Sequence, residues 1–117
     1  MTTMTAQNII TATQALLKDS GTATPKFDVT TEILPFVGPA EMAVIRERPD
    51  SLIAESGTLR SATPILSATQ VMTIDDKWKL ACAHFVCQHA YGMEAGDNFD
   101  ATRAGMHAEM FRIEVAR

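Results

Sequence analysis

Two cysteines and two histidines lie close together in the sequence, at Cys82, His84, Cys87 and His89. These residue types bind zinc and form thiol–imidazole catalytic pairs. On a helix that turns about 100° per residue, His84 and Cys87 share one face while Cys82 and His89 share another, so four ligands cannot meet at one ion. The same geometry makes a disulfide between the two cysteines unfavourable. We therefore predict no metal site, no cofactor and no catalytic site, and we interpret the four residues as part of the core.

The stretch that carries these residues, 74–91, is predicted to be a central helix. Asp75 and Asp76 place acceptors and negative charge at its first turn, and Gly92 can adopt a left-handed conformation at its end. Apolar residues cover most of its faces, as expected of a helix in the middle of a protein. We interpret Trp78 as the edge of the core rather than as an interface anchor.

Two helices are predicted in the N-terminal half. We expect residues 1–4 to be loose and Thr5 to cap a helix that runs to about Lys18. An apolar residue followed by a cap, Phe27 and Asp28, marks the entry to the second helix.

Prolines interrupt this second helix. Pro35 removes a ladder hydrogen bond and crowds the preceding turn. We predict a break with Gly38 as the cap and Pro39 at the first position of a fresh helix that continues to Arg48. Pro49 then ends it. Its charged end is interpreted as solvated, with a partner contact as the alternative.

The segment 51–73 is rich in Ser and Thr and contains β-favouring runs at residues 57–60 and 70–73. It is predicted to be a loop with one short hairpin. A last helix follows over about 99–115, capped by Asp97 or Asn98. Its apolar seam comprises Ala101, Ala104, Ala108, Phe111 and Val115. The short connection favours an antiparallel arrangement against the central helix.

The length of 117 residues predicts a single domain over 1–117. The net charge is −4 and no stripe of Lys and Arg occurs, which disfavours tight binding to nucleic-acid phosphates. No apolar run approaches the ~20 residues that span a bilayer, and the opening lacks signal-peptide features, so we expect a soluble chain without a membrane partner. The predicted fold class is mainly α: a small helical bundle with a short loop or β-hairpin insertion between the N-terminal helices and the C-terminal helix pair.

Residues 75–111 resemble the closing helix pair of head–tail adaptor proteins, the connector or head-completion subunits of tailed bacteriophages. The likeness lies in an acidic start, an apolar helix that ends in Ala90 and Tyr91, a turn with Asn98, and a helix with Ala104 and a late Phe111. The N-terminal part is similar as well, in the stretch from residue 5 to residue 21, the Phe27–Asp28 pair, residues 32–34, and the closing residues 48–50. Related adaptors have a longer β-rich middle, and the prolines fall where they have a continuous helix.

The resemblance implies a structural virion protein that is not an enzyme. It implies a ring of about a dozen copies on the portal protein, a tail or nozzle/neck protein as the next partner, and a place at the head–tail junction of the virion after assembly in the host cytoplasm. Genomic DNA is expected to pass through the ring without specific binding, since exposed acids repel phosphate. The alternative is a stand-alone cytoplasmic helical interaction module or small regulator.

Two segments are candidates for the interface with the portal. In the adaptor family the chain ends reach into neighbours, which selects Ile113, Val115 and Arg117. The second candidate is the segment 51–73, with Leu59 and Arg60, because a Ser/Thr-rich segment can become ordered on binding. We expect removal of either segment to spare folding and to abolish docking.

Overall fold

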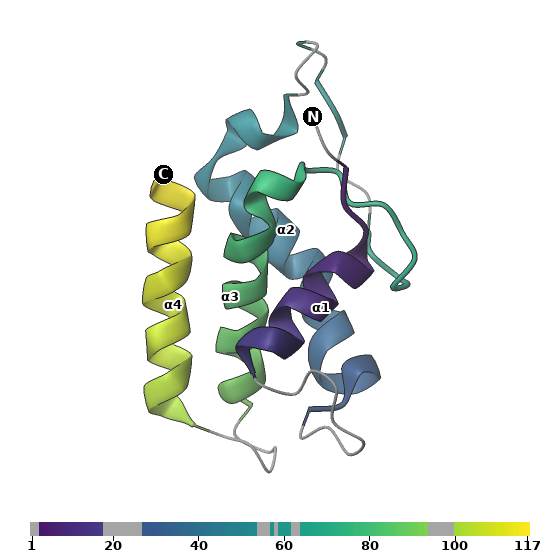
Figure 1. The fold of residues 1–117 in the computed structure, drawn as a ribbon. Coiled ribbons are helices and arrows are strands. Elements are labelled where there is room, and N and C mark those ends of the chain that lie inside the picture. The colour runs from purple at the N-terminus through teal and green to yellow at the C-terminus, as the bar shows by residue number, and fades with distance from the viewer. Residues whose placement is uncertain (1–2, 18–26, 54–56, 58, 62–63, 94–99) are drawn as a thin grey trace.

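The computed structural model describes residues 3–17, 27–53, 57, 59–61, 64–93 and 100–117. Within these residues the chain is mainly α-helical, which confirms the predicted fold class, and the only β-pairing consists of isolated bridges. The helices are α1 (Ala6–Leu16), α2 (Val37–Glu47), α3 (Lys79–Tyr91) and α4 (Ala101–Ala116). Figure 1 shows α3 in the middle, with α4 on one side and α1 and α2 on the other.

Helix α3 is the central element that the sequence predicts, and most of its residues are buried. A 3-10 turn, Asp76–Trp78, precedes it, and Trp78 lies in the core. The predicted left-handed end at Gly92 is wrong, because this residue has φ −86°. A side chain there would place its Cβ 3.0 Å from the carbonyl oxygen of Gln88, so close backbone approach is what favours glycine.

Helix α1 begins where the sequence predicts. The Thr5 amide donates to Asn8 Oδ1 over 2.8 Å. The next two amides, of Ala6 and Gln7, donate to carbonyl oxygens of the segment 68–70. The expectation that residues 1–4 are loose is wrong for Met4, which is buried and whose carbonyl accepts the Met72 amide over 2.8 Å.

The second helical region begins at Asp28, as predicted, with Asp28 Oδ1 accepting from the amides of Thr30 and Thr31. The backbone then passes through a π turn and a 3-10 turn before α2: Val29–Ile33 and Leu34–Phe36. The break therefore falls at Pro35, and the predicted cap at Gly38 is wrong. Gly38 and Pro39 lie inside the first turn of α2, where a missing N–H costs no helical hydrogen bond. Helix α2 ends at Glu47, as the Arg48–Pro49 pair predicts.

A 3-10 turn, Pro49–Leu52, opens the middle segment. Ile53 and Leu59 form an isolated antiparallel bridge, and Val71 pairs with Thr5. Residues 54–56 and 58 lie outside the described part, so the hairpin stays a prediction. Met72 and Thr73 are buried. Removal of the whole segment 51–73 would therefore take away core and the partners of α1, which contradicts the expectation that folding survives it.

Helix α4 runs antiparallel to α3, as predicted (Figure 1). Asp100 caps it by accepting the Arg103 amide over 3.0 Å. The predicted caps, Asp97 and Asn98, lie outside the described residues. The seam begins later than expected, because Ala101 is exposed, and it includes a buried polar residue, His107.

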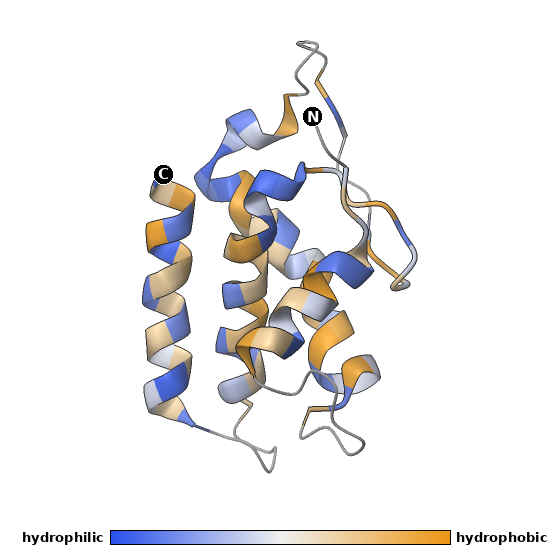
Figure 2. Cartoon of the chain, in the orientation of Figure 1, coloured by the Kyte–Doolittle hydropathy of each residue, from blue (hydrophilic) through white to orange (hydrophobic). Residues whose placement is uncertain are grey.

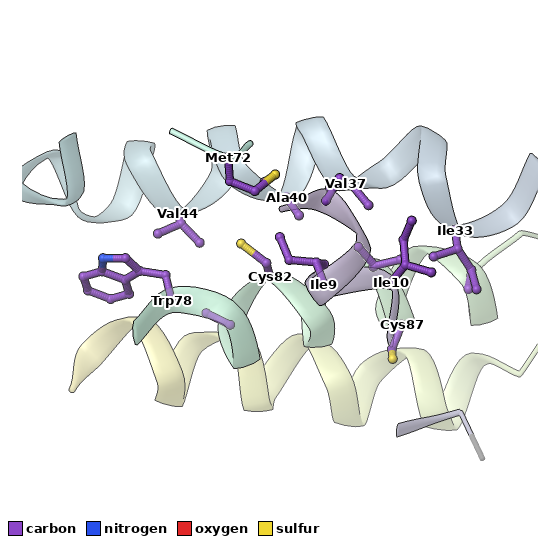
Figure 3. Close-up of a cluster of buried hydrophobic side chains, with 14 of the residues drawn as sticks. Ile9, Ile10, Ile33, Val37, Ala40, Val44, Met72, Trp78, Cys82 and Cys87 are labelled. Carbon is purple, nitrogen blue, oxygen red and sulfur yellow. The ribbon is translucent and has the colours of Figure 1, made fainter. Parts of the chain in front are cut away.

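The core lies where α1, α2 and α3 meet. Figure 3 shows Ile9 and Ile10 of α1 next to Val37 and Ala40 of α2, with Cys82 of α3 beside Ile9. Helix α4 packs chiefly on α3 and mixes polar with apolar residues along its length (Figure 2). One face of α4 therefore packs against α3, and the rest of its surface is exposed.

Candidate functional site

The chemistry-bearing residues of α3 are distributed over different neighbours. The thiol of Cys82 is buried beside Glu41, and burial raises its pKa. Burial also raises the pKa of the Cys87 thiol, to about 12, and its sulfur lies 3.9 Å from the Thr13 carbonyl oxygen. The His89 ring packs against aromatic rings, and burial lowers its pKa. Both thiols are free, as the sequence predicts.

His84 instead meets a histidine of α4. The Nδ1 atoms of His84 and His107 are 2.9 Å apart and both side chains are buried. One ring must donate a proton and the other must accept it. Burial lowers the pKa of both imidazoles; the His84 and Arg103 charges lower that of His107 further, while Glu114 acts to raise that of His84. The pair therefore joins α3 to α4 most strongly while it is not fully protonated.

A groove runs beside this pair, between the end of α1 and the first half of α4. Its volume is about 460 Å³. It is lined by apolar and polar residues, namely Leu16, His84, Tyr91, Arg103, Met106, His107 and Met110. We call it the α1–α4 groove. Met106 is 53% exposed, so the groove offers apolar surface to an incoming side chain.

A second apolar surface lies near the start of α3, beside Arg60 and its partner Asp75. Ile53 and Leu59, which face each other in the antiparallel bridge, are 50% and 72% exposed. We call this pair the tip. The Arg60 amide donates to the Leu52 carbonyl, and the Arg60 guanidinium pairs with Asp75 over 2.9 Å. Of the two candidates predicted in this segment, Leu59 is therefore on the surface, whereas Arg60 anchors the tip to the start of α3.

The predicted C-terminal candidates also differ in their exposure to solvent. Ile113 and Arg117 are exposed, whereas Val115 is buried in the core. Arg48 donates to the carbonyl oxygens of Val115 and Arg117 over 2.9 and 3.0 Å. Its guanidinium also lies 5.0 Å from the centre of the Trp78 ring. The end of α4 is thus fixed to the end of α2.

Sequence reasoning missed the buried polar side chains His107 and Glu41. The interpretation of the charged end of the second helix as solvated is wrong for Arg48, which is half-buried and donates to the end of α4. Glu41 is 1% exposed and its Oε2 accepts the amides of Thr73 and Ile74 over 2.7 and 3.1 Å. A helical signal for Glu41 exists, because it falls on the same face as Val37 and Val44. His107 falls likewise on the Ala104–Phe111 seam. The partners of these side chains lie too far away in sequence for spacing to identify them.

Comparison with protein-family models, curated proteins and solved structures gave no match. Among the described helices, none has the length and hydropathy needed to cross a membrane. The part of the chain that the structure describes also contains no group of three or more His, Cys, Asp or Glu side chains arranged to hold a metal ion. The tip and the α1–α4 groove are exposed surfaces with apolar side chains, and we treat them as the candidate functional site.

Proposed function

We propose that this chain is a head–tail adaptor of a tailed bacteriophage, which docks as a ring on the portal and extends the DNA channel towards the tail. The observation that carries the proposal is the closing helix pair, whose acidic start, Ala-Tyr end and late Phe resemble those of the adaptors. In the fold, the Tyr and the late Phe of this pattern contact aromatic residues of other segments. The Tyr91 ring packs edge-on against Phe27 at 5.3 Å and stacks on His107 at 5.7 Å, and Phe111 contacts Phe85 at 5.6 Å.

The distribution of surfaces supports a role in assembly rather than in catalysis. The tip and the groove expose aliphatic and Met side chains at two separate places. A subunit with two contact surfaces can bind a neighbour on each side, as a ring requires. Weak contacts between neighbours are strengthened once the subunits are held on one symmetric platform such as the portal.

The charge of the chain also suits the proposal. With a net charge of −4, the subunit presents more acids than bases to its surroundings. Exposed acids along a channel repel DNA phosphates, so the genome can slide through without specific binding. In this proposal the partners are the portal protein, a tail or neck protein, and further copies of the chain.

A stand-alone helical interaction module is the second candidate function. The α1–α4 groove favours it, because an amphipathic helix from a single partner can dock in such an apolar groove. Neighbouring genes separate the two candidates, since portal and capsid genes beside this one support an adaptor.

Labelling of intact virions tests the proposal. Antibodies against the purified chain should place gold particles at the junction of head and tail. Label along the tail shaft, over the capsid, or only in the soluble fraction of infected cells would contradict it. Antibodies against the portal and against a tail-tube protein provide the matched positional controls.

A further inference from the structure

Helix α4 is held to the rest of the molecule by a narrow contact. It packs chiefly on α3 (Figure 1), and the buried residues of this fully described helix are His107 and Val115. Val115 lies near the end of the helix, where Arg48 donates to the last carbonyl oxygens. In the first half of α4 the buried side chain is His107, whose ring contacts His84 and stacks on Tyr91.

The contact between the two imidazoles changes with the number of protons that they carry. Their Nδ1 atoms are 2.9 Å apart, so one ring donates the hydrogen bond and the other accepts it. When both rings are protonated, neither Nδ1 atom can accept, and two positive charges face each other at a buried position. The second proton therefore replaces an attraction between α3 and α4 by a repulsion.

The neighbours of the pair offset only part of this repulsion. Arg103 of α4 adds a further positive charge beside the α4 imidazole, whereas the Glu114 carboxylate of α4 acts on His84 in the opposite sense. Tyr91 of α3 stacks on the α4 imidazole, and its hydroxyl accepts from Arg103 over 3.3 Å. Leu16 of α1, which lines the same groove, carries no charge.

We infer that the His84–His107 pair is an acid-sensitive latch, which holds α4 on α3 at neutral pH and releases it when both imidazoles are protonated. The apolar core between α1, α2 and α3 contains neither histidine, so these three helices should stay packed together. Release uncovers Phe85 of α3, which contacts Phe111 while α4 is in place. The Arg48 guanidinium keeps its charge over this pH range, so its contact with the end of α4 does not respond to acid.

The direction of the pH dependence follows from the two forms of the pair. Burial lowers the pKa of both imidazoles while α4 is held, and in the released form both pKa values return towards about 6.5. The released form therefore binds more protons below about pH 6.5, and α4 is held most firmly above that pH. The equilibrium constant for release should rise by up to about tenfold per pH unit for each extra proton bound.

Hydrogen exchange measured by mass spectrometry tests the latch, after correction for the pH dependence of intrinsic exchange. Between about pH 7.5 and about pH 5, the amides of α4 should lose at least about tenfold more protection than those of α1 and α2. His107→Gln keeps a hydrogen-bonding side chain opposite His84 but does not titrate, so α4 should stay protected in this variant. His84→Gln is the reciprocal variant and should behave in the same way.

His89→Gln is the matched control. Burial lowers the pKa of His89 too, but its ring contacts are with Phe36 and Phe85. This variant should therefore lose the protection of α4 at about pH 5, as the unaltered chain does. Anilinonaphthalene sulfonate, a dye that binds exposed apolar surface, gives a second readout. At about pH 5 it should bind the unaltered chain and His89→Gln, and bind His107→Gln and His84→Gln much less.

Equal loss of protection in α1, α2 and α4 of the unaltered chain would overturn the latch, because it would mean unfolding of the whole domain. Protection of α4 that does not fall at about pH 5 would overturn it as well. So would an equal loss from α4 in the unaltered chain and in both variants of the pair. The latch does not depend on the adaptor function, so none of these results bears on that function.

Discussion

Glu41→Ala is predicted to cause a large loss of stability, because the Glu41 side chain is buried and accepts two hydrogen bonds. Glu41 projects from α2 into the core and its Oε2 accepts two backbone amides, those of Thr73 and Ile74. These amides belong to the segment that leads into α3 and have no helical partner of their own. Alanine removes the acceptor and leaves both N–H groups without one.

The size of the expected stability loss follows from the number of backbone amides that lose their acceptor. Each buried donor without a partner costs about 1–3 kcal/mol, so the two together cost about 2–6 kcal/mol. Domains of this size are stable by about 5–15 kcal/mol, and the variant is therefore expected to unfold at much lower denaturant concentration. Glu47→Ala, at an exposed position of the same helix, should change stability by less than about 0.5 kcal/mol.

Glu41→Gln separates hydrogen bonding from charge. Burial raises the pKa of the Glu41 carboxyl, while the Ile74 and Thr73 amides and the Arg60 charge act to lower it. A group whose pKa is higher in the folded chain favours folding when protonated, and this contribution is lost as pH rises through the folded pKa. Glutamine keeps an acceptor oxygen and carries no charge. The variant should therefore be at least as stable as the unaltered chain at pH 7 and should lose this part of the pH dependence.

Urea unfolding followed by circular dichroism and by Trp78 fluorescence measures all three variants. The midpoint should shift with little change in slope, since the surface exposed on unfolding is nearly the same. The reasoning would be refuted if Glu41→Ala matched the unaltered chain, or if Glu41→Gln were as unstable as Glu41→Ala at pH 7.

Three further predictions concern the other interior contacts. Because the pKa values of His84 and His107 are lowered in the folded chain, the unfolded chain binds more protons below about pH 6.5. The free energy of unfolding should therefore decrease as the pH is lowered, by up to about 1.4 kcal/mol per pH unit for each extra proton. A thermal midpoint that stays constant between about pH 7 and about pH 5 would contradict this. Arg48→Met should speed hydrogen exchange at the last amides of α4, because the guanidinium donates to two carbonyls there, and unchanged exchange would argue against that role. The thiols of Cys82 and Cys87 should react with a disulfide reagent only after unfolding, since both are buried and their pKa values are raised; prompt reaction of the native chain would count against this packing.

Local signals in the sequence predicted the elements well. The apolar stretch before Gly92 became the central helix, Thr5 and Asp28 begin their helices, and the Arg48–Pro49 pair ends α2. Each of these signals depends on neighbours within a few residues, which is the range over which caps and prolines act. The fold class could therefore be predicted from the sequence.

The pairings between distant segments could not be predicted from the sequence. Met4 is buried because the segment around Met72 pairs with it, and Gly38 is helical because the break occurs earlier, at Pro35. The His84–His107 contact joins two helices whose relative rotation no spacing rule supplies. The α1–α4 groove depends on the same rotation, so its residues could not be assembled from periodicity alone.

The mass of the complex between the purified chain and the portal ring from the same source tests the adaptor function most directly. Docking on a symmetric ring fixes the copy number, so native mass spectrometry should show a stable gain of about a dozen chains. A folded, helical chain that leaves the mass of the portal unchanged would contradict the adaptor function and favour an independent interaction module.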